Sequence, residues 1–395
     1  MEGVKVVELG LWIAGPSCGG ILADWGADVV KVEPLVGDPF RSLEWLYPGS
    51  VNPPFELDNR GKRSIALDIT TTEGSAIVHD LLVDADVFLT NYRVGGLERA
   101  GLDYEGLAEH YPRLIYAHVS GYGRTGAERD RAAYDVGAFY SRGGIGAALT
   151  PADGDIPYPR GGMGDHMTGL AAAGGVAAAL YSRERSGEGQ LVATSLLRLG
   201  AYMHGWDHNV TARLDLEAEP YTRTAPPNPL INGYRCGDGK WVWLLGMEAD
   251  RHWPQVVKAL GHPEWEHDVR FDSIETRREH TAELVALMDA VLAARSREEW
   301  AEVFDDHDVW WARVQTTLDL RNDPQARDAG CYVPAPLGDG ETGEMVATPV
   351  DFGTTEWFIR EPSPELGQHT ELLLMELGKD WDEIERLRRA GAIAS

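Results

Sequence analysis

Short runs of apolar, mostly β-branched residues recur through the first half of the chain and alternate with helical segments. The runs cover residues 4–9, 28–32, 87–89, 114–119 and 190–194. Such runs are typical of strands that are buried on both faces. Between them, residues 74–83 carry apolar side chains at helical spacing, and the alanine-rich residues 166–184 predict an interior helix. Strand–helix–strand alternation predicts an α/β fold with a parallel sheet.

The pattern changes after about residue 202. Residues 226–229 read Pro-Pro-Asn-Pro and indicate a linker, and residues 234–246 predict a β-hairpin that turns at Gly237-Asp238-Gly239. Charged amphipathic helices are predicted at 248–260, 277–294 and 297–306, and two short helices separated by Gly378 at about 368–390. We therefore expect a second, α+β domain over residues 225–325.

Charge and cysteine content exclude several classes of function. The 395 residues include 63 Asp and Glu but only 36 Lys and Arg, for a formal net charge of −27. A field of that sign repels nucleic acid and anionic membranes, so neither is expected as a partner. The three cysteines lie far apart with no CxxC or Cys/His spacing, which favours a reducing compartment and no metal site. With no signal-peptide pattern and no segment long enough to span a bilayer, we expect a cytoplasmic protein.

Residues 121–126, Gly-Tyr-Gly-Arg-Thr-Gly, match the dinucleotide-binding pattern G-x-G-x-x-G. In a true dinucleotide site this pattern opens a helix. Here it continues as Ala-Glu-Arg-Asp-Arg, which lacks an apolar helical face. We therefore expect a plain glycine loop, with neither NAD nor flavin as a cofactor.

Asp165 follows a glycine run, Gly161-Gly162-Met163-Gly164, at the start of the alanine-rich helix. One interpretation is a helix N-cap, because an aspartate there accepts hydrogen bonds from free N–H groups. The other is a nucleophilic carboxylate, approached closely through the glycines and kept ionised by the helix N-terminus. The two interpretations are compatible. His166, directly after it, is a weaker candidate for a functional role.

Basic residues gather in the N-terminal third of this acidic chain, and together they are candidates for phosphate contacts. They are Arg41, Lys62, Arg63, Arg93, Arg99, Arg124, Arg129 and Arg131.

Several segments together resemble the class III CoA-transferases, also called the CaiB/BaiF family. They are Val-Val-Glu-Leu-Gly (6–10), Ala-Gly-Pro (14–16), Leu-Ala-Asp-Trp-Gly-Ala-Asp-Val-Val-Lys-Val-Glu-Pro (22–34), Asn-Arg-Gly-Lys-Arg-Ser-Ile-Ala-Leu-Asp (59–68), Asn-Tyr-Arg (91–93), Pro-Arg-Leu-Ile-Tyr (112–116), Ser-Gly-Tyr-Gly (120–123), Gly-Asp-His-Met-Thr-Gly (164–169), Arg-Ser-Gly-Glu-Gly-Gln (185–190) and Gly-Gln-His-Thr (367–370). The resemblance implies a Rossmann-like large domain built from both chain ends, a smaller α+β domain and an interlocked homodimer. The expected domains are therefore residues 1–224, 225–325 and a return segment, 326–395.

The resemblance also implies the chemistry. Asp165 matches the catalytic aspartate, which would carry CoA from an acyl-CoA donor to a carboxylic acid through covalent aspartyl intermediates. The family's CoA-binding positions match Trp12, Ile13, Leu67, Asp68, Thr70, Asn91, Tyr92, Arg93, Arg99, Arg131, Ala132 and Asp135. A glutamine often found in the first loop is Ile13 here. A lysine sometimes found at position 132 is alanine, with Arg131 as a possible substitute.

The alternative is the α-methylacyl-CoA racemase branch of the same superfamily, which moves an α-proton with an Asp/His pair. Asp165 would again be the aspartate, but the histidine position matches Tyr134. A phenol has an ordinary pKa of about 10, so it replaces imidazole poorly in proton transfer near pH 7. Glu248 matches an acidic residue of the racemases and keeps this branch open.

Overall fold

The computed structural model describes residues 1–47, 52–338 and 340–394. The chain divides into two compact units. The first consists of Met1–Ala147, Tyr158–Asp215 and Gly330–Ser395, and the second of Ala148–Pro157 and Leu216–Ala329. The domain boundaries expected from the sequence stay a prediction.

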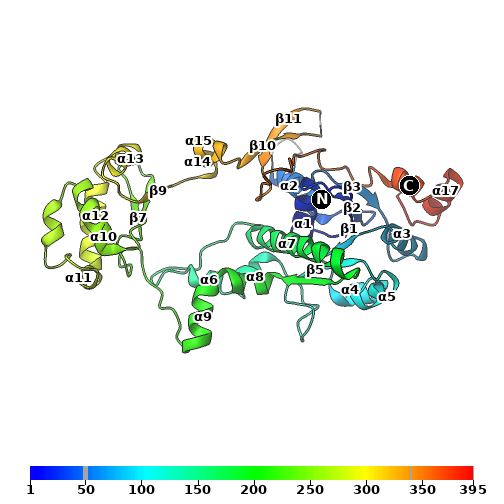
Figure 1. The fold of residues 1–395 in the computed structure, drawn as a ribbon, viewed down its shortest axis with the longest axis horizontal. Helices are drawn as coiled ribbons and strands as arrows, with labels where there is room; N and C mark the ends of the chain where they lie inside the picture. Colours follow the sequence, from blue (N-terminus) through cyan, green and yellow to red (C-terminus); the bar gives the residue numbers. More distant parts are fainter. Residues whose placement is uncertain (48–51, 339, 395) are drawn as a thin grey trace. The chain divides into compact units, whose positions relative to one another are not determined.

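A six-stranded parallel sheet forms the centre of the first unit (Figure 1). Its strands are β1 Lys5–Leu9, β2 Asp28–Glu33, β3 Arg63–Ala66, β4 Val87–Thr90, β5 Ile115–Ser120 and β6 Leu191–Ser195. The strand order is β3-β2-β1-β4-β5-β6, and every neighbouring pair is parallel. The prediction of an α/β fold is therefore confirmed. The sequence analysis missed β3, because Arg63 and Ser64 interrupt its apolar run.

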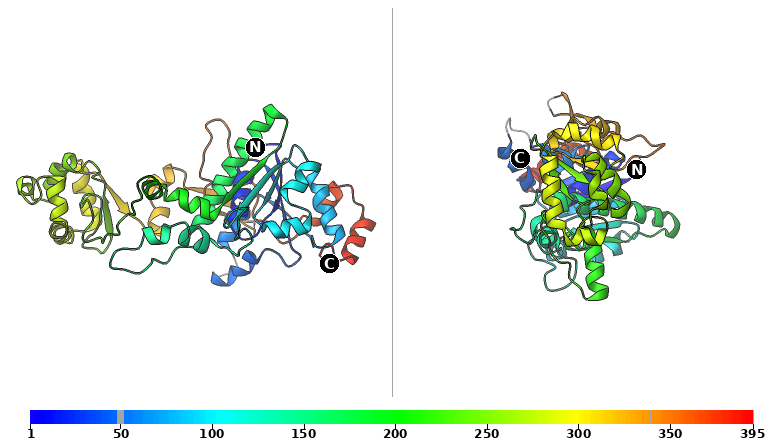
Figure 2. Two further views of the ribbon diagram at one scale, coloured as in Figure 1. Left: turned by 90° about the horizontal axis from the view of Figure 1, so that it is seen from below. Right: turned by 90° about the vertical axis from the view of Figure 1, so that its left-hand side faces the viewer.

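Alternate residues of the strands supply two separate cores. Val7, Leu9 and Val30 face one core, which α3 Thr72–Leu82, α4 Val94–Ala100, α5 Tyr104–His110, α16 Thr370–Glu376 and α17 Trp381–Arg389 complete. Val6 and Val29 face the other, which α1 Ala14–Asp24 and α7 Met163–Ser186 complete. Figure 2 shows these helices on both sides of the sheet. The layers are therefore helix, sheet, helix, as a buried parallel sheet requires.

Helix α7 approaches α1 closely because it carries a glycine at the contact. A Cβ on Gly169 would lie 2.0 Å from Oγ of Ser17 and 2.9 Å from the backbone N of Cys18, both on α1. Gly19 of α1 lies instead against β1, where a Cβ would stand 1.8 Å from Oε2 of Glu8. The composition of α7 predicts a helix that is buried on all sides, but one side of it is exposed in the single chain. Ala172 and Val176 are buried, whereas Ala171 and Tyr181 on the opposite side are exposed in the single chain.

The end of the chain returns to the β3 edge of the sheet. The backbone N–H of His369 donates to O of Ser64, and Lys379 on the link to α17 pairs with Asp80 of α3 at 3.0 Å. In Figure 1 the red helices α16 and α17 accordingly lie beside α3. The two terminal helices, separated by Gly378, match the expected pattern.

The second unit contains the antiparallel strands β7 Gly233–Arg235, β8 Trp241–Leu244 and β9 Trp311–Val314, and the β7–β8 pair is the predicted hairpin. Its helices are α10 Ala249–Ala259, α11 Ile274–Glu279, α12 Thr281–Leu292, α13 Arg297–Asp306, α14 Thr317–Arg321 and α15 Pro324–Asp328. The single helix predicted at 277–294 is in fact two, because a capping box at Ser273 starts α11 early and the chain leaves helical geometry at His280.

The remaining elements are short or peripheral. They are a 3₁₀ helix at Pro39–Leu46, α2 Pro53–Asn59, a π-helix at Val136–Ser141, α6 Ile145–Ala148, α8 Leu196–Met203, α9 Gly205–Leu214, a 3₁₀ helix at Pro263–His267 and the hairpin strands β10 Tyr332–Pro336 and β11 Thr342–Val346. Among the described residues, no helix combines the length and apolar character that crossing a membrane requires.

Candidate active site

The strand order reverses direction between β1 and β4, which are neighbours in the sheet. In open α/β sheets, the crevice outside the carboxyl ends of two such strands is where ligands bind. The loops that leave these two strands are joined directly. Nδ2 of Asn91 donates to O of Leu11 at 2.7 Å, and N–H of Leu11 donates to Oδ1 of Asn91 at 3.0 Å. The topology alone therefore directs attention to the loops at residues 11–13 and 91–93.

A cavity of about 670 Å³ lies at this crevice. It is lined by the loops after β1 and β4, the end of β5, residues 130–134 and the first turn of α7. Nine of the residues predicted from sequence line it: Trp12, Asn91, Tyr92, Arg93, Arg99, Arg131, Ala132, Tyr134 and Asp165. Segments from positions 12 to 165 thus meet at one place.

The other predicted residues lie elsewhere in the first unit. Leu67, Asp68 and Thr70 line a second cavity of about 470 Å³ beyond the carboxyl ends of β1, β2 and β3, and Tyr92 lines both cavities. The carboxylate of Asp68 accepts hydrogen bonds from N and Oγ1 of Thr70 at 3.0 and 2.6 Å.

Ile13 and Asp135 line neither of these two cavities. Cδ1 of Ile13 lies 3.4 Å from where a Cβ on Gly162 would stand, and Asp135 is buried beside the first cavity's residues 130–134. Both are therefore neighbours of the site's walls.

Asp165 is the third residue of α7 and is not its N-cap. Gly162 holds the N-cap position with φ 79°, a left-handed conformation that glycine adopts freely. The carboxylate of Asp165 makes no hydrogen bond or ion pair with the residues that the structure describes. Of the two interpretations offered by the sequence, the N-cap is therefore wrong, and the side chain faces the cavity unpaired.

The electrostatics of Asp165 also differ from expectation. Burial, with the negative charge of Asp135 adding to it, raises the pKa of Asp165 to about 7, although the neighbouring His166 acts in the opposite direction. The helix N-terminus was expected to keep this carboxylate ionised. Desolvation outweighs that influence, so near neutral pH the group exists in both protonation states.

His166 is held by a buried carboxylate. Its Nε2 lies 3.0 Å from Oδ1 of Asp58, whose side chain is only 2% exposed. Although burial opposes it, the hydrogen bond with Asp58 and the nearby acidic groups raise the pKa of His166. The sequence offered no signal for this pair, because the two residues are more than a hundred positions apart.

Most of the clustered basic residues are already paired. Arg41 binds Glu33, Lys62 binds Glu8, Arg63 binds Asp28, Arg124 binds Glu105, Arg129 binds Glu98 and Arg131 binds Glu128. Arg93 and Arg99 differ: both line the cavity, both are exposed, and neither side chain has a hydrogen-bond or ion-pair partner among the described residues. Guanidinium groups without carboxylate partners are suited to phosphate oxygens.

Two aromatic rings form part of the cavity wall. The rings of Trp12 and Tyr134 meet edge to face with centroids 5.4 Å apart. Tyr134 is 57% exposed in the single chain.

The glycine pattern at 121–126 is a loop. No helix follows it until Val136, so the context needed for a dinucleotide site is missing. Gly121 is required for packing. A Cβ at this position would lie 2.2 Å from Cβ of Ala133, and both residues line the cavity. Among the described residues, no cluster of three or more His, Cys, Asp or Glu side chains suits a metal ion.

The sequence analysis missed a buried set of charges beneath the first loop: Glu8, Lys31 and Asp38. Its signal was present, since Glu8 and Lys31 are charged residues inside strands expected to be buried on both faces. Such residues are rarely buried without partners.

Comparison with known proteins shows which family the chain resembles. CoA-transferase family III matches residues 1–370. The (R)-2-hydroxy-4-methylpentanoate CoA-transferase of Clostridioides difficile is 33% identical over 98% of both chains. The cinnamoyl-CoA:phenyllactate CoA-transferase of Clostridium sporogenes is 32% identical over 98% of this chain and 96% of its own. The crystal structure of a CAIB/BAIF family protein from Brucella suis superposes with a TM-score of 0.83 at 29% identity, covering 95% of this chain and 98% of that one.

The chain therefore belongs to CoA-transferase family III. The resemblance seen in the sequence is confirmed, and so is the class of enzyme that it implied.

Proposed function

We propose that this enzyme moves CoA from an acyl-CoA donor to a carboxylic acid through covalent intermediates on Asp165. The observation that carries the proposal is that one cavity is lined both by an unpaired carboxylate, Asp165, and by two unpaired guanidinium groups, Arg93 and Arg99. A nucleophile and a phosphate-binding region are what a thioester of CoA needs at its two ends.

In the proposed sequence, an oxygen of Asp165 attacks the thioester carbon, and the CoA thiolate leaves to give a mixed anhydride. The thiolate then attacks the aspartyl carbonyl, which releases the donor acid as a carboxylate and leaves an aspartyl-CoA thioester. The acceptor carboxylate displaces the thiolate again to form a second anhydride. Attack of the thiolate on the acceptor's carbonyl releases the new acyl-CoA and restores Asp165. Each step exchanges one acyl bond for another of similar energy.

Coenzyme A is the substrate that the family implies, and we propose that it occupies both cavities of the first unit. Arg93 and Arg99 would contact its phosphates, with Arg131, Ala132 and Asn91 beside them. The cavity lined by Leu67, Asp68 and Thr70 would take the remaining part, because Tyr92 lines both. Trp12 would form part of the wall of the CoA site. Ile13 and Asp135, which do not line either cavity, would support the residues that form this wall.

The experiment is to incubate the enzyme with acyl-CoA, add hydroxylamine and identify modified residues by mass spectrometry. The proposal expects modification of Asp165. An untouched Asp165 during full-speed exchange contradicts it. The acids that appear in the names of the two bacterial relatives, (R)-2-hydroxy-4-methylpentanoate and phenyllactate, make a rational first panel of acceptors.

A racemase is the second candidate, since Tyr134 and Asp165 line the same cavity. Glu248 belongs to the second unit and pairs with Arg251. A racemase would leave Asp165 unmodified and exchange solvent deuterium into the α-carbon of the substrate. A transferase would modify Asp165 without that exchange.

We also propose that the enzyme works in the cytoplasm as an interlocked homodimer. The exposed aromatic residues of α8 and α9 support a partner copy: Tyr202 is 80% and Trp206 85% exposed in the single chain. Light scattering after size exclusion tests this, and a monomer at micromolar concentration contradicts it.

A further inference from the structure

Trp12, which lines the cavity, has an unusual backbone. Its φ is 63°, and Trp12, Asp215 and Asp308 are the non-glycine residues with positive φ in the described chain. The left-handed region is disfavoured for a bulky side chain, so the surrounding structure must hold it there.

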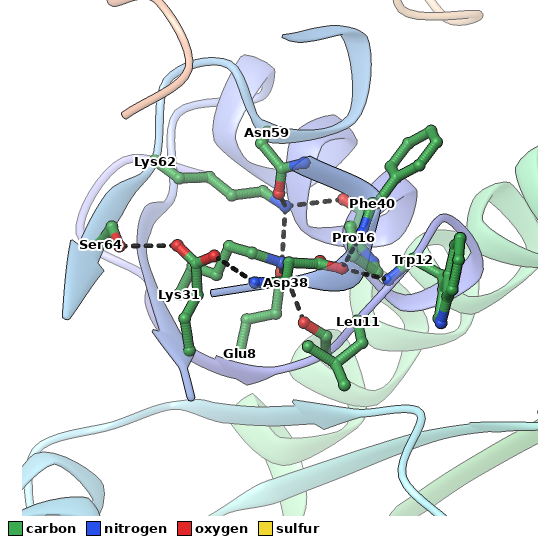
Figure 3. A network of polar contacts seen from close by, with 12 residues as sticks. Glu8, Leu11, Trp12, Pro16, Lys31, Asp38, Phe40, Asn59, Lys62 and Ser64 are labelled. Atoms are coloured by element: carbon green, nitrogen blue, oxygen red, sulfur yellow. Dashed lines mark hydrogen bonds and ion pairs between the residues drawn. The ribbon is translucent and has the colours of Figure 1, made fainter. Parts of the chain in front are cut away.

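Asp38 supplies that hold (Figure 3). Its Oδ1 accepts hydrogen bonds from N–H of Trp12 and N–H of Phe40, both at 3.0 Å. Its Oδ2 accepts from Nζ of Lys31, also at 3.0 Å. One carboxylate thus joins the strained residue to the segment that carries Phe40, whose ring lies 6.1 Å from that of Trp12.

Two buried lysines secure the backbone on either side of Trp12. Nζ of Lys31 donates to O of Gly10 at 2.9 Å, and Nζ of Lys62 donates to O of Pro16 at 2.8 Å. Glu8 lies between them, 3.3 Å from Lys31 and 2.8 Å from Lys62. Figure 3 shows this chain of contacts beneath the loop.

All four charges of the network, Glu8, Lys31, Asp38 and Lys62, have side chains that are 0% exposed. Two acids balance two bases. A buried ionic network of this kind is often no more stabilising than well-packed apolar residues. Stability alone therefore does not account for placing it under the one loop that carries Trp12.

We propose that Asp38, fixed by Lys31, is a positioning residue that presets the Trp12 loop for CoA. The inference rests on the proposed function and deepens it. Asp38 does not touch the cavity. It acts through Trp12, whose ring position beside Tyr134 depends on the left-handed backbone that Asp38 holds.

The experiment measures CoA binding by calorimetry for the wild type, Asp38→Ala, Trp12→Ala and the double variant. Removing the acceptor of the Trp12 N–H should weaken CoA about tenfold. Because Asp38 acts through Trp12, the double variant should bind no more weakly than Trp12→Ala alone. Additive losses would overturn the proposal.

Asp38→Asn provides rescue, since an amide oxygen can still accept the N–H of Trp12. It should recover part of the affinity that Asp38→Ala loses. Should Asp38→Ala fail to fold, Asp38→Asn takes its place in the cycle: the affinity that it still loses, through its weaker contact with Lys31, should disappear when Trp12 is already alanine. The matched control is Asp24→Asn, which breaks a buried ion pair of the same unit, 2.6 Å to Arg60, away from the loop. Its CoA affinity should stay within about twofold.

The outcomes separate the two proposals. A wild-type enzyme that binds no CoA overturns the proposed function and this inference with it. If the wild type binds CoA and the Asp38→Ala variant binds it equally tightly, only the positioning role of Asp38 is overturned.

Discussion

Two carboxylates of the first unit, Glu33 and Asp165, have opposite electrostatic environments. Glu33 is fully buried, yet it accepts hydrogen bonds from Arg41 at 2.7 and 2.8 Å, from Ser64 at 2.7 Å and from N–H of Asp38 at 3.1 Å. Although burial pushes the other way, the Arg41 hydrogen bonds and the charge of Lys31 hold the pKa of Glu33 below its ordinary value. Asp165 has no such donors, and burial raises its pKa to about 7.

The comparison shows that donors, and not depth alone, decide how a buried carboxylate behaves. Glu33 is satisfied and belongs to the structure. Asp165 is unsatisfied, faces a cavity and is poorly solvated, which suits a nucleophile. The charges beneath the first loop are thus paired, whereas the cavity is lined by three charged groups without partners among the described residues, Asp165, Arg93 and Arg99.

The strongest test of this contrast is removal of the unpaired carboxylate. Asp165→Ala should reduce CoA transfer by about 10³-fold or more, because the proposed covalent route needs this carboxylate. CoA binding, measured by calorimetry, should be largely preserved, since the phosphate contacts that we propose for Arg93 and Arg99 remain. Turnover like that of the wild type would reject Asp165 as the nucleophile.

The second test uses pH. Only ionised Asp165 can attack a thioester, so kcat/KM for the acyl-CoA should fall about tenfold for each unit below pH 7. The profile is measured with the free acid groups of the substrate already ionised, between pH 5 and 8.5. A rate independent of pH over that range would contradict a nucleophile whose pKa is near 7.

The third test concerns the unpaired arginines. Arg93→Ala and Arg99→Ala should each weaken CoA by about tenfold if they contact phosphate. Whichever contacts the 3′-phosphate should weaken CoA more than dephospho-CoA. The matched control is Arg63→Ala, a basic residue paired with Asp28 and Glu376 outside the cavity, which should change affinity less than twofold. Equal losses for both ligands would reject a 3′-phosphate contact for that arginine.

Much of the fold could be predicted because the sheet depends on local patterns. The apolar runs marked five of the six parallel strands, and only β3, with Arg63 and Ser64, was concealed. Asp165 was singled out as a candidate nucleophile by its glycine run and by the resemblance, and its position in the helix was predicted only to within a few residues. Its protonation could not be foreseen, because it depends on Asp135 and on burial that the strand order creates. The hydrogen bond from N–H of Trp12 to Asp38 could not be predicted either, because the spacing of residues in a sequence does not show which of them are hydrogen-bond partners.

The smallest effect expected is on stability, and there the two carboxylates should respond with opposite sign. The folded-state pKa of Asp165 is raised, so its ionisation destabilises the fold increasingly as pH rises from about 4 to about 7. Asp165→Asn should therefore have a larger free energy of unfolding than the wild type at pH 8. This gain should be about 1–2 kcal/mol larger at pH 8 than at pH 5.5.

The folded-state pKa of Glu33 is lowered, so its carboxylate stabilises the fold above its ordinary pKa, and that contribution is lost as pH falls through the lowered value. Glu33→Gln should accordingly lose stability at pH 8. Urea unfolding of both variants at the two pH values measures this, and a loss of stability in both at pH 8 would show that the contrast between paired and unpaired carboxylates is wrong.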